Sequence, residues 1–545
     1  LGVGDVRELK RLRNEFVISY VDQFSSKFLF TCPRLYATRM LQEFTPHLLE
    51  RRSLLLLMCG LQRMYPVPVH ALQQPGLFSG DLSHRVASFL GGASVLGTYV
   101  APAAGAADMS VIGRHCAWLK REGIAPTAFM TRQQRLGPKG PPPLTLAYPM
   151  AAAKFHKVPM GWRYIACSST YTLRALSVWL TQAFRALMPS VDAMWNSRMA
   201  EAGVRGSGSW LLSDSRRVAT MAREMNNGIA KGDREGQSLQ TFDFAKMYTN
   251  IRLDVLKRRM RRLMGALFEF ERQGQRTRRF LSVAKRKEKC GWVARDEGDS
   301  QFRKVFDADK LSRWFEYLVD NIYLDFAGGV LRQRIGIPMG TNCAVFVANL
   351  FCFTYEYAFI TRLQRAGRVA LIRQFRYTKR YIDDLLSGAN PAFSQYLYDS
   401  PPNAAGVRGI YPRFLTVAQE QSSAESVSFL DTRFVFAQNR WFTDIYDKRE
   451  HPPLSRVNSL KYPHPSSFLS ARSKFGIITS RLCCFSRICQ RKKDFIARAR
   501  IFLGEFRERG YPLNKIRSFV LRFLKVTPLH FHVRSRHLLM RAMLP

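Results

Sequence analysis

The stretch "KRYIDDLLSGAN", residues 379–390, places two adjacent carboxylates inside an apolar segment. An aromatic and an aliphatic residue precede Asp383 and Asp384, and two leucines follow them. Apolar strands around a short polar turn are typical of a β-hairpin, so we expect both aspartates at its tip. Unpaired carboxylates would repel each other and resist burial, whereas Mg²⁺ prefers such hard oxygen donors. The stretch therefore predicts a divalent-cation site, with a water-exposed Asp-Asp turn as the alternative.

The charge of the chain indicates a polyanionic partner. The 545 residues include 84 Lys plus Arg and 41 Asp plus Glu, a net charge of +43. This excess is far beyond what solubility needs, so nucleic acid is the first expectation. Dense basic runs at 257–262, 276–289 and 491–500 are interleaved with apolar residues. We therefore expect basic faces of folded elements, not a disordered tail.

Cysteine usage and hydropathy suggest a reduced intracellular protein without a membrane partner. The tight group Cys483, Cys484 and Cys489 lacks the paired spacing of a zinc site. We find no pattern typical of a signal peptide and no apolar run long enough to span a bilayer. The chain begins with Leu1, which leaves open that it is a fragment without its N-terminal address.

A third carboxylate stands in the segment "TFDFAKMYTNI" at 241–251. Phe242 and Phe244 bracket Asp243, and this pattern predicts a buried strand. Tyr248 follows at the start of a turn or helix. The segment therefore offers a partner for the aspartates of the hairpin.

A glycine loop and an apolar run lie between these segments, at 336–360. The loop around Gly340 is followed by Thr341 or Asn342 as a helix cap. The apolar run that follows predicts a largely buried helix, with Glu356 near its end. Strand carboxylate, glycine loop with helix, and Asp-Asp hairpin thus occur in this order.

The three segments resemble motifs A, B and C of the reverse transcriptase palm, namely "FDFAKMY", "PMGT" opening a helix, and "YIDD" on a hairpin. Residues 154–180 resemble the fingers segment that faces the incoming triphosphate. "SFLDTRFVF" at 428–436 resembles the strand pair that supports the primer. Three stretches are most similar to Penelope-like retroelement enzymes, which are relatives of telomerase. They are the residues of motif A, the "FLD" block and "RGYPLNKI" at 509–516. The match covers roughly residues 145–520.

The resemblance implies an α+β right-hand polymerase with fingers, an antiparallel-sheet palm and a helical thumb. Residues 1–145 would form a mostly helical N-terminal extension with a role in RNA binding, ending in the breaker "GPKGPPP". Fingers and palm would occupy 146–440, with an insertion at 254–332 between motifs A and B. The basic region 441–545 would be the helical thumb that grips the duplex backbone.

The activity implied is that of an RNA-directed DNA polymerase, which extends a DNA primer on an RNA template with deoxynucleoside triphosphates. Two Mg²⁺ ions about 4 Å apart, for which Mn²⁺ can substitute, would activate the primer hydroxyl and neutralise the phosphates. By the resemblance, Asp243 and Asp383 would bridge the ions and Asp384 would support them. The Phe244 carbonyl would supply another oxygen.

The resemblance also assigns a nucleotide site. Lys157 and Arg163 would neutralise the triphosphate, and Lys154 is a weaker candidate. Tyr248 would lie under the sugar and exclude a 2′-hydroxyl. Gly340, which lacks a Cβ, would let the backbone approach the template-nucleotide pair. The alternatives are ordinary basic surface for the cations, ordinary core for the tyrosine and a simple turn for the glycine.

Two positions differ from patterns common among related polymerases, and no complete GIY-YIG motif is recognised. Met339 stands where retroviral enzymes often have Gln, as it does in other Penelope-like sequences. After motif C, "LTVAQEQSSAE" offers Gln419 and no lysine, so the general acid for pyrophosphate release is not identified. "RGIYPRF" at 408–414 lacks the second half of a GIY-YIG motif, so we recognise no endonuclease domain of that kind.

Two other functions stay open beside the polymerase. One is a non-catalytic nucleic-acid-binding protein of the same fold, such as a domesticated element, although a scaffold has no need of three carboxylates. The other is a telomerase-like enzyme with a dedicated RNA. The resemblance also implies a nuclear location.

Overall fold

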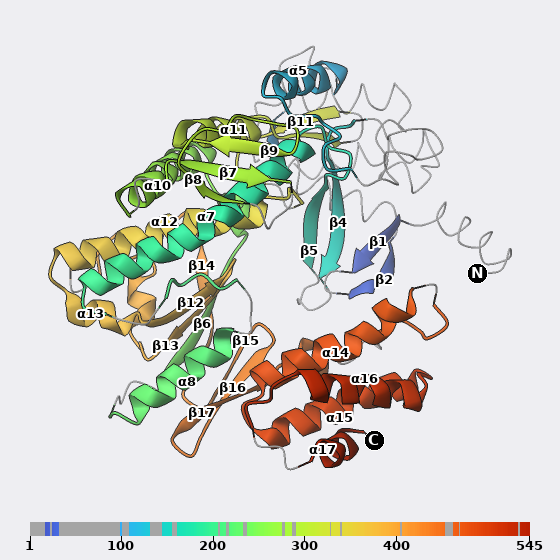
Figure 1. Ribbon diagram of the computed structural model, residues 1–545. Coiled ribbons are helices and arrows are strands. Elements are labelled where there is room, and N and C mark those ends of the chain that lie inside the picture. Colours follow the sequence, from blue (N-terminus) through green and yellow to red (C-terminus); the bar gives the residue numbers. More distant parts are fainter. Residues whose placement is uncertain are drawn as a thin grey trace, which may run out of the picture. The chain divides into compact units, whose positions relative to one another are not determined.

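A computed structural model gives the chain a mixed helix and sheet fold, which confirms the α+β class (Figure 1). The structure describes residues 17–21, 24–31, 99–100, 108–130, 144–154, 161–204, 208–213, 217–232, 237–274, 278–285, 290–326, 329–337, 340–403, 406–452, 462–467, 469–531 and 535–544. Most of the predicted N-terminal extension therefore lies outside the described residues. Its role in RNA binding stays a prediction. Its described elements are strands β1 (Val17–Val21), β2 (Phe24–Thr31) and β3 (Tyr99–Val100) and helix α5 (Asp108–Arg121).

The chain divides into two units. The first holds residues 1–197 and 246–355, and the second holds 198–245 and 356–545. The division falls inside helices α7 (Arg174–Glu201) and α12 (Ala344–Arg365) and after strand β6 (Leu239–Phe244). These units are groups of residues in contact and differ from the predicted domains. The predicted domain limits at 145 and 440 therefore stay predictions.

Within its described residues, the first unit contains three sheets. One has the strand order β2-β1-β4-β5, with β4 (Tyr148–Lys154) and β5 (Gly161–Cys167) as an antiparallel pair. The others have the orders β10-β11-β3 and β8-β7-β9. The remaining strands of these two sheets are β7 (Phe280–Ala284), β8 (Gly291–Val293), β9 (Arg303–Phe306), β10 (Tyr323–Phe326) and β11 (Gly329–Gln333).

The predicted insertion consists of α10 (Leu253–Gly274), β7 to β9, α11 (Ala308–Asp320), β10 and β11. Helix α10 buries apolar residues at helical spacing and exposes basic ones, as the sequence predicts for this run. Two of its cations are nevertheless paired inside the insertion. Lys257 Nζ lies 2.7 Å from Asp320, and Arg261 Nη2 lies 2.7 Å from Glu316. This basic face therefore carries less free charge than its sequence suggests.

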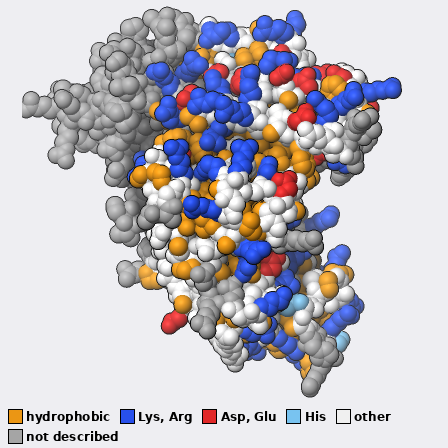
Figure 2. Space-filling view, turned by 90° about the vertical axis from the view of Figure 1, so that its left-hand side faces the viewer, with side chains coloured by type: hydrophobic (Ala, Val, Ile, Leu, Met, Phe, Trp, Pro, Cys, Tyr) orange, Lys and Arg blue, Asp and Glu red, His pale blue; other side chains and the backbone are white. Residues whose placement is uncertain are grey.

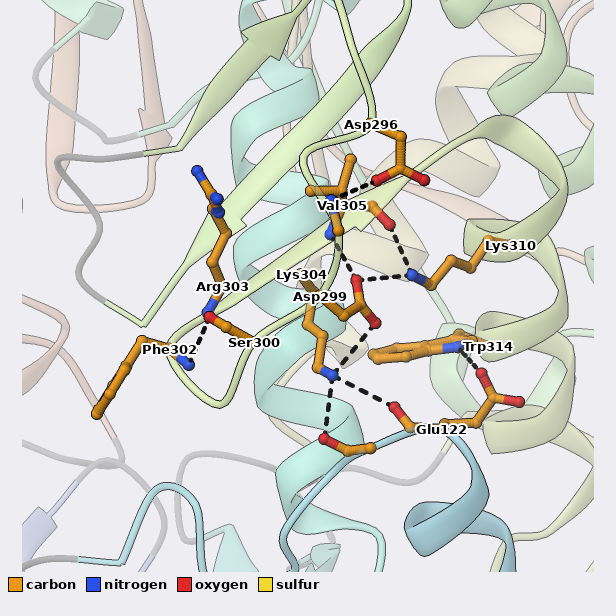
Figure 3. A network of polar contacts seen from close by, with 12 residues as sticks. Glu122, Asp296, Asp299, Ser300, Phe302, Arg303, Lys304, Val305, Lys310 and Trp314 are labelled. Carbon is orange, nitrogen blue, oxygen red and sulfur yellow. Dashed lines mark hydrogen bonds and ion pairs between the residues drawn. The ribbon is translucent and has the colours of Figure 1, made fainter.

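A polar network joins the insertion to the end of α5 (Figure 3). Lys304, which is 2% exposed, donates to the carbonyl oxygens of Glu122 at 3.3 Å and Gly123 at 3.0 Å. It also contacts Asp299 at 3.2 Å, and Lys310 donates to the same carboxylate at 2.8 Å. Burial by itself raises the pKa of Asp299, but the Lys310 bond, a backbone amide and both lysine charges outweigh it and hold the pKa below its usual value.

We expect Asp299→Asn to lower the free energy of unfolding by about 1–3 kcal/mol at pH 7, because it leaves the buried Lys304 ammonium without its counter-charge. The lowered pKa stabilises the fold above the unfolded pKa of about 4, and this contribution is lost as the pH falls through the folded value. Denaturant unfolding at pH 7 and pH 3 measures both effects. The exposed pair offers a control in Glu316→Gln, with an expected loss below about 1 kcal/mol. An equal Asp299→Asn loss at the two pH values would contradict this account.

The second unit is built on an antiparallel sheet with the order β12-β13-β6-β14. Its strands besides β6 are β12 (Tyr377–Tyr381), β13 (Asp384–Gly388) and β14 (Val417–Ser423). Helix α8 (Val218–Ile229) packs on one face, where Met221 and Met225 share a core with Leu239 and Leu386. Gly388 lies close to this contact, and a Cβ there would lie 2.8 Å from the side-chain ends of both methionines.

A second sheet, β15-β16-β17, packs beside α8 in the same core. Its strands are β15 (Ser426–Phe429), β16 (Thr432–Ala437) and β17 (Arg440–Ile445). The buried Asn226 of α8 joins this sheet through two bonds to the backbone of Trp441, at 2.7 and 2.8 Å. The short helices α13 (Val369–Gln374) and η6 (Lys448–Glu450) belong to the same unit.

The C-terminal region is helical, as the sequence predicts. Its helices are α14 (Ala471–Ile488), α15 (Lys492–Glu508), α16 (Leu513–Val526) and α17 (Arg536–Met543), which form a bundle (Figure 1). The core of the bundle is largely aromatic, with Phe485, Phe495, Phe502, Phe506 and Phe523 buried.

Helix α12 corrects one expectation about apolar runs. By length and composition alone it could cross a membrane, with a mean hydropathy of 1.4 in its most apolar window. However, 61% of that window is buried inside the protein. Glu356 within it is fully buried and ion-paired with Arg380. Burial and an internal ion pair are typical of a core helix.

Candidate active site

Two of the predicted carboxylates face each other across neighbouring strands. Asp243 lies near the end of β6, and Asp384 at the start of β13 is its direct partner in the antiparallel ladder. Directly opposed residues project from the same face of a sheet, with Cβ atoms about 4.5–5.5 Å apart. A slip of one residue would turn one of them toward the opposite face, so the apolar pattern of both strands holds this register.

The third carboxylate occupies the turn between β12 and β13, which confirms the predicted hairpin. Tyr381 pairs with Asp384, so Ile382 and Asp383 alone form the connection. The Asp383 carbonyl accepts from the Phe244 amide at 3.1 Å, which ties the turn to β6. Ile382 has a φ of +56°, a conformation that β-branched residues rarely adopt and that costs of order 1–3 kcal/mol.

The carboxylates act on one another electrostatically. Burial, followed by the charge of Asp383, raises the pKa of Asp384 to about 7. The charges of Asp243 and Glu420 raise this pKa further, and that of Lys448 lowers it. Such a cluster does not carry its full negative charge at neutral pH unless positive charge lies beside it.

The donor set fits Mg²⁺ as a partner. Among the residues that the structure describes, no three carboxylate, imidazole or thiol groups converge into a ready-made metal cage. Mg²⁺ seldom uses such cages, because it keeps several waters and takes one or two carboxylates plus substrate phosphates. Asp243, Asp383 and Asp384 offer hard oxygen donors of this kind. The Phe244 carbonyl as a further donor stays a prediction.

Glu420 and Lys448 were missed by the sequence analysis. Glu420 is the extra residue of a β-bulge in β14, between Gln419 and Gln421, which pair with consecutive residues of β6. Lys448 comes from η6, beyond β17, whereas the sequence search for a lysine covered only the segment after motif C. No local pattern marks either residue, since both act on Asp384 through the tertiary fold.

The predicted triphosphate-binding cations belong to the first unit. Lys154 ends β4 and pairs with Gly161, and Arg163 in β5 pairs with Ala152. In an antiparallel pair this places both cations on the same face, in diagonal positions. Lys157 lies outside the described residues.

Backbone hydrogen bonds join Tyr248 and Ile251 to the loop segment before Gly340. The Tyr248 carbonyl accepts from the Ile337 amide at 2.6 Å, and the Gly336 amide donates to Ile251 at 2.7 Å. Gly336 has a φ of +85°, and a Cβ there would lie 2.4 Å from the Tyr248 carbonyl oxygen. Tyr248, in helix α9 (Met247–Asn250), is therefore held by the loop through its backbone.

Gly340 itself packs against strand β5. Its φ is +113°, and a Cβ would lie 2.0 Å from the carbonyl oxygen of Ala166. Its own carbonyl accepts from Ser168 Oγ at 2.7 Å. Neither contact was predicted. They give Gly340 a structural reason that adds to its predicted approach to a nucleotide.

Each unit thus contains one group of the predicted site residues, the cation-binding group in one and the nucleotide-binding group in the other. The carboxylates and Phe244 lie together in the second unit. The loop of Gly340 contacts both Tyr248 and the strand of Arg163 in the first unit. The combined use of the two sets in one reaction belongs to the proposed function.

Comparison with known proteins finds no matching family model and no matching curated protein. Among solved structures, the chain is similar to the telomerase from Candida albicans in complex with a TWJ fragment of telomeric RNA. The TM-score is 0.47 at 10% identity, over 80% of this chain and 67% of that chain. It is also similar to the apo telomerase from Candida tropicalis, with a TM-score of 0.37 at 12% identity, over 70% of this chain and 56% of that chain.

A third similar structure is the RNA-dependent RNA polymerase of a human picorbirnavirus. The TM-score is 0.37 at 10% identity, over 96% of this chain and 81% of that chain. Likenesses this weak establish neither a family nor an activity. The predicted Penelope-like family is therefore not shown, and the function rests on the residues themselves.

Proposed function

We propose that this protein is a nucleic-acid polymerase, and specifically an RNA-directed DNA polymerase of the right-hand architecture and the Penelope-like type. One observation carries the proposal. Asp243 and Asp384 are directly opposed on neighbouring antiparallel strands, with Asp383 in the turn beside them. The sheet β12-β13-β6-β14 would then be the palm, the pair β4–β5 part of the fingers, and α14 to α17 the thumb.

The carboxylates would hold the cations of the reaction. When bound, two Mg²⁺ or Mn²⁺ ions supply the positive charge that favours an ionised primer hydroxyl and neutralises the phosphates. Asp243 would bind them from β6 and Asp383 from the turn between β12 and β13, and Asp384 would support the pair. Hydrogen bonding of the Asp383 carbonyl to Phe244 keeps the turn beside β6 before any ligand arrives.

The first unit would hold the nucleotide. The triphosphate would be bound by Arg163, Lys154 and Lys157. The arginine would make a bidentate contact through its guanidinium. The loop that supports Tyr248 would fix the position of the tyrosine ring beneath the sugar. An RNA template, a DNA primer and deoxynucleoside triphosphates are the partners that these roles require.

The charge of the surface supports a nucleic-acid partner. Lys and Arg side chains are spread over the face in Figure 2. On α15, the basic residues Lys492, Lys493, Arg500 and Arg507 are exposed, whereas its aromatic residues are buried. We propose that this helix contacts the phosphate backbone of the duplex, with a strong salt dependence as its signature.

Primer extension tests the proposal. Purified protein would receive a DNA primer annealed to an RNA or to a DNA template, with Mg²⁺ and either deoxynucleotides or ribonucleotides. We expect extension on RNA with deoxynucleotides. Extension only with ribonucleotides would replace the proposal with an RNA polymerase, and binding without any extension would favour the non-catalytic alternative. A specific RNA recovered with the protein would favour the telomerase-like alternative.

Tyr248→Ala is expected to relax sugar selection by about tenfold or more, because it opens room for a 2′-hydroxyl. The measurement is the ratio of kcat/KM for a deoxynucleotide to that for the matching ribonucleotide. Tyr248→Phe keeps the ring and is the control, with an unchanged ratio. If the alanine variant also leaves the ratio unchanged, Tyr248 is an ordinary packing residue.

A further inference from the structure

A buried ion pair holds the hairpin that carries Asp383. Arg380 and Glu356 are both fully buried. Arg380 Nε donates to Glu356 Oε1 at 2.5 Å and Nη2 donates to Oε2 at 3.3 Å. The remaining guanidinium nitrogen, Nη1, donates to the carbonyl of Ile382 at 2.9 Å. One side chain thus links helix α12 to the turn.

The partners of Arg380 are themselves fixed. Glu356 Oε1 also accepts from the hydroxyl of Tyr411, which is fully buried, at 2.8 Å. The backbone of Arg380 is held as well. Its amide donates to the Trp210 carbonyl at 2.6 Å, and its carbonyl accepts from the Leu212 amide at 2.8 Å. The guanidinium therefore has little freedom to move.

Arg380 acts on the site through the backbone. It pairs with Leu385, whereas Tyr381 pairs with Asp384. Alternate residues of a strand face opposite sides, so the guanidinium lies on the sheet face opposite to Asp384. Its guanidinium reaches the turn through the hydrogen bond from Nη1 to the Ile382 carbonyl.

The turn needs such support. Ile382 has a φ of +56°, and strained residues persist only where their surroundings over-determine them. Its carbonyl is held by Arg380, and the next carbonyl, that of Asp383, is held by the Phe244 amide. Both bonds act on the two residues that connect the strands.

Stability alone does not explain this ion pair. Apolar residues of similar volume often replace a buried ion pair without loss of stability, so the pair points to a geometric role. We propose that Glu356, Arg380 and Tyr411 form a positioning network that fixes the Asp383 hairpin in its cation-binding geometry. The inference rests on one part of the proposed function, namely the binding of a cation by Asp383.

The first test is the double variant Arg380→Met with Glu356→Leu, which removes the pair without leaving a buried charge. We expect weaker Mn²⁺ binding, by about tenfold in electron paramagnetic resonance titrations, and faster hydrogen exchange of the amides at 381–386. In primer extension, kcat should fall by about tenfold or more while the KM for template-primer stays within about twofold. The matched control is Arg261→Met with Glu316→Leu, another two-pronged Arg-Glu pair outside the hairpin.

Milder variants keep the test decisive if the double variant fails to fold. Arg380→Lys keeps the charge beside Glu356 but loses the fork that reaches Ile382. Tyr411→Phe removes one hydrogen bond and should give a smaller change in the same direction. Unchanged Mn²⁺ affinity and unchanged exchange at 381–386 in folded Arg380→Lys would overturn the inference. Both should shift even if the parent protein extends no primer, in which case the proposed function fails and the positioning network stands.

Discussion

Asp243→Asn or Asp383→Asn should reduce primer extension to less than about one-hundredth of the parent rate. Each change removes a negative oxygen donor from the pair that would hold both cations. Binding of template-primer should stay within about twofold, because it depends mainly on phosphate contacts of the basic surface. Single-turnover extension and fluorescence anisotropy at fixed salt measure the two quantities separately.

The control for this prediction is Glu425→Gln, which removes one negative charge from an exposed position of the same unit. It should leave extension unchanged. Asp384→Asn should cost less than either main variant, about tenfold, since Asp384 only supports the cations. An Asp243→Asn variant that keeps more than about one-hundredth of the parent rate would contradict the two-metal assignment.

The local parts of the site were readable from the sequence. The hairpin at 379–390 follows from apolar strands around a polar turn, and the structure places the turn at Ile382 and Asp383. The helix expected within 336–360 is found at Ala344–Arg365. Both features depend on residues close together in the chain, where periodicity and turn chemistry act.

The parts that depend on distant residues were not readable. Arg380 is one of 84 basic residues, and nothing local separates a buried arginine from a surface one. Its carboxylate partner, Glu356, lies on a different element, and only the tertiary fold brings them together. The same holds for Asp243 and Asp384. The resemblance implied that the three carboxylates act together, but no pattern within either strand determines that these two are direct partners. The division of the chain inside helices α7 and α12 has no local signal either.

Gly340 shows how a residue predicted for one reason has another in the structure. The sequence-based hypothesis gave it a role in substrate approach. In the structure, a Cβ at this position would lie 2.0 Å from the Ala166 carbonyl oxygen, at a φ of +113°. We therefore expect Gly340→Ala to lower the free energy of unfolding by about 2–4 kcal/mol, from steric overlap and backbone strain together. Denaturant unfolding measures this loss.

Gly367→Ala separates the two contributions, because Gly367 also has a positive φ, +65°, but a Cβ there would meet no atom within 4 Å. It should cost only the strain, about 1 kcal/mol, and leave extension unchanged. Gly340→Ala should in addition move the loop away from β5, and with it the backbone that supports Tyr248, so kcat should fall by about ten- to a hundredfold. If Gly340→Ala unfolds like Gly367→Ala and raises only the KM for the nucleotide, the glycine serves substrate approach alone. A loss of stability beyond that of Gly367→Ala would instead assign it to the packing of the loop on β5.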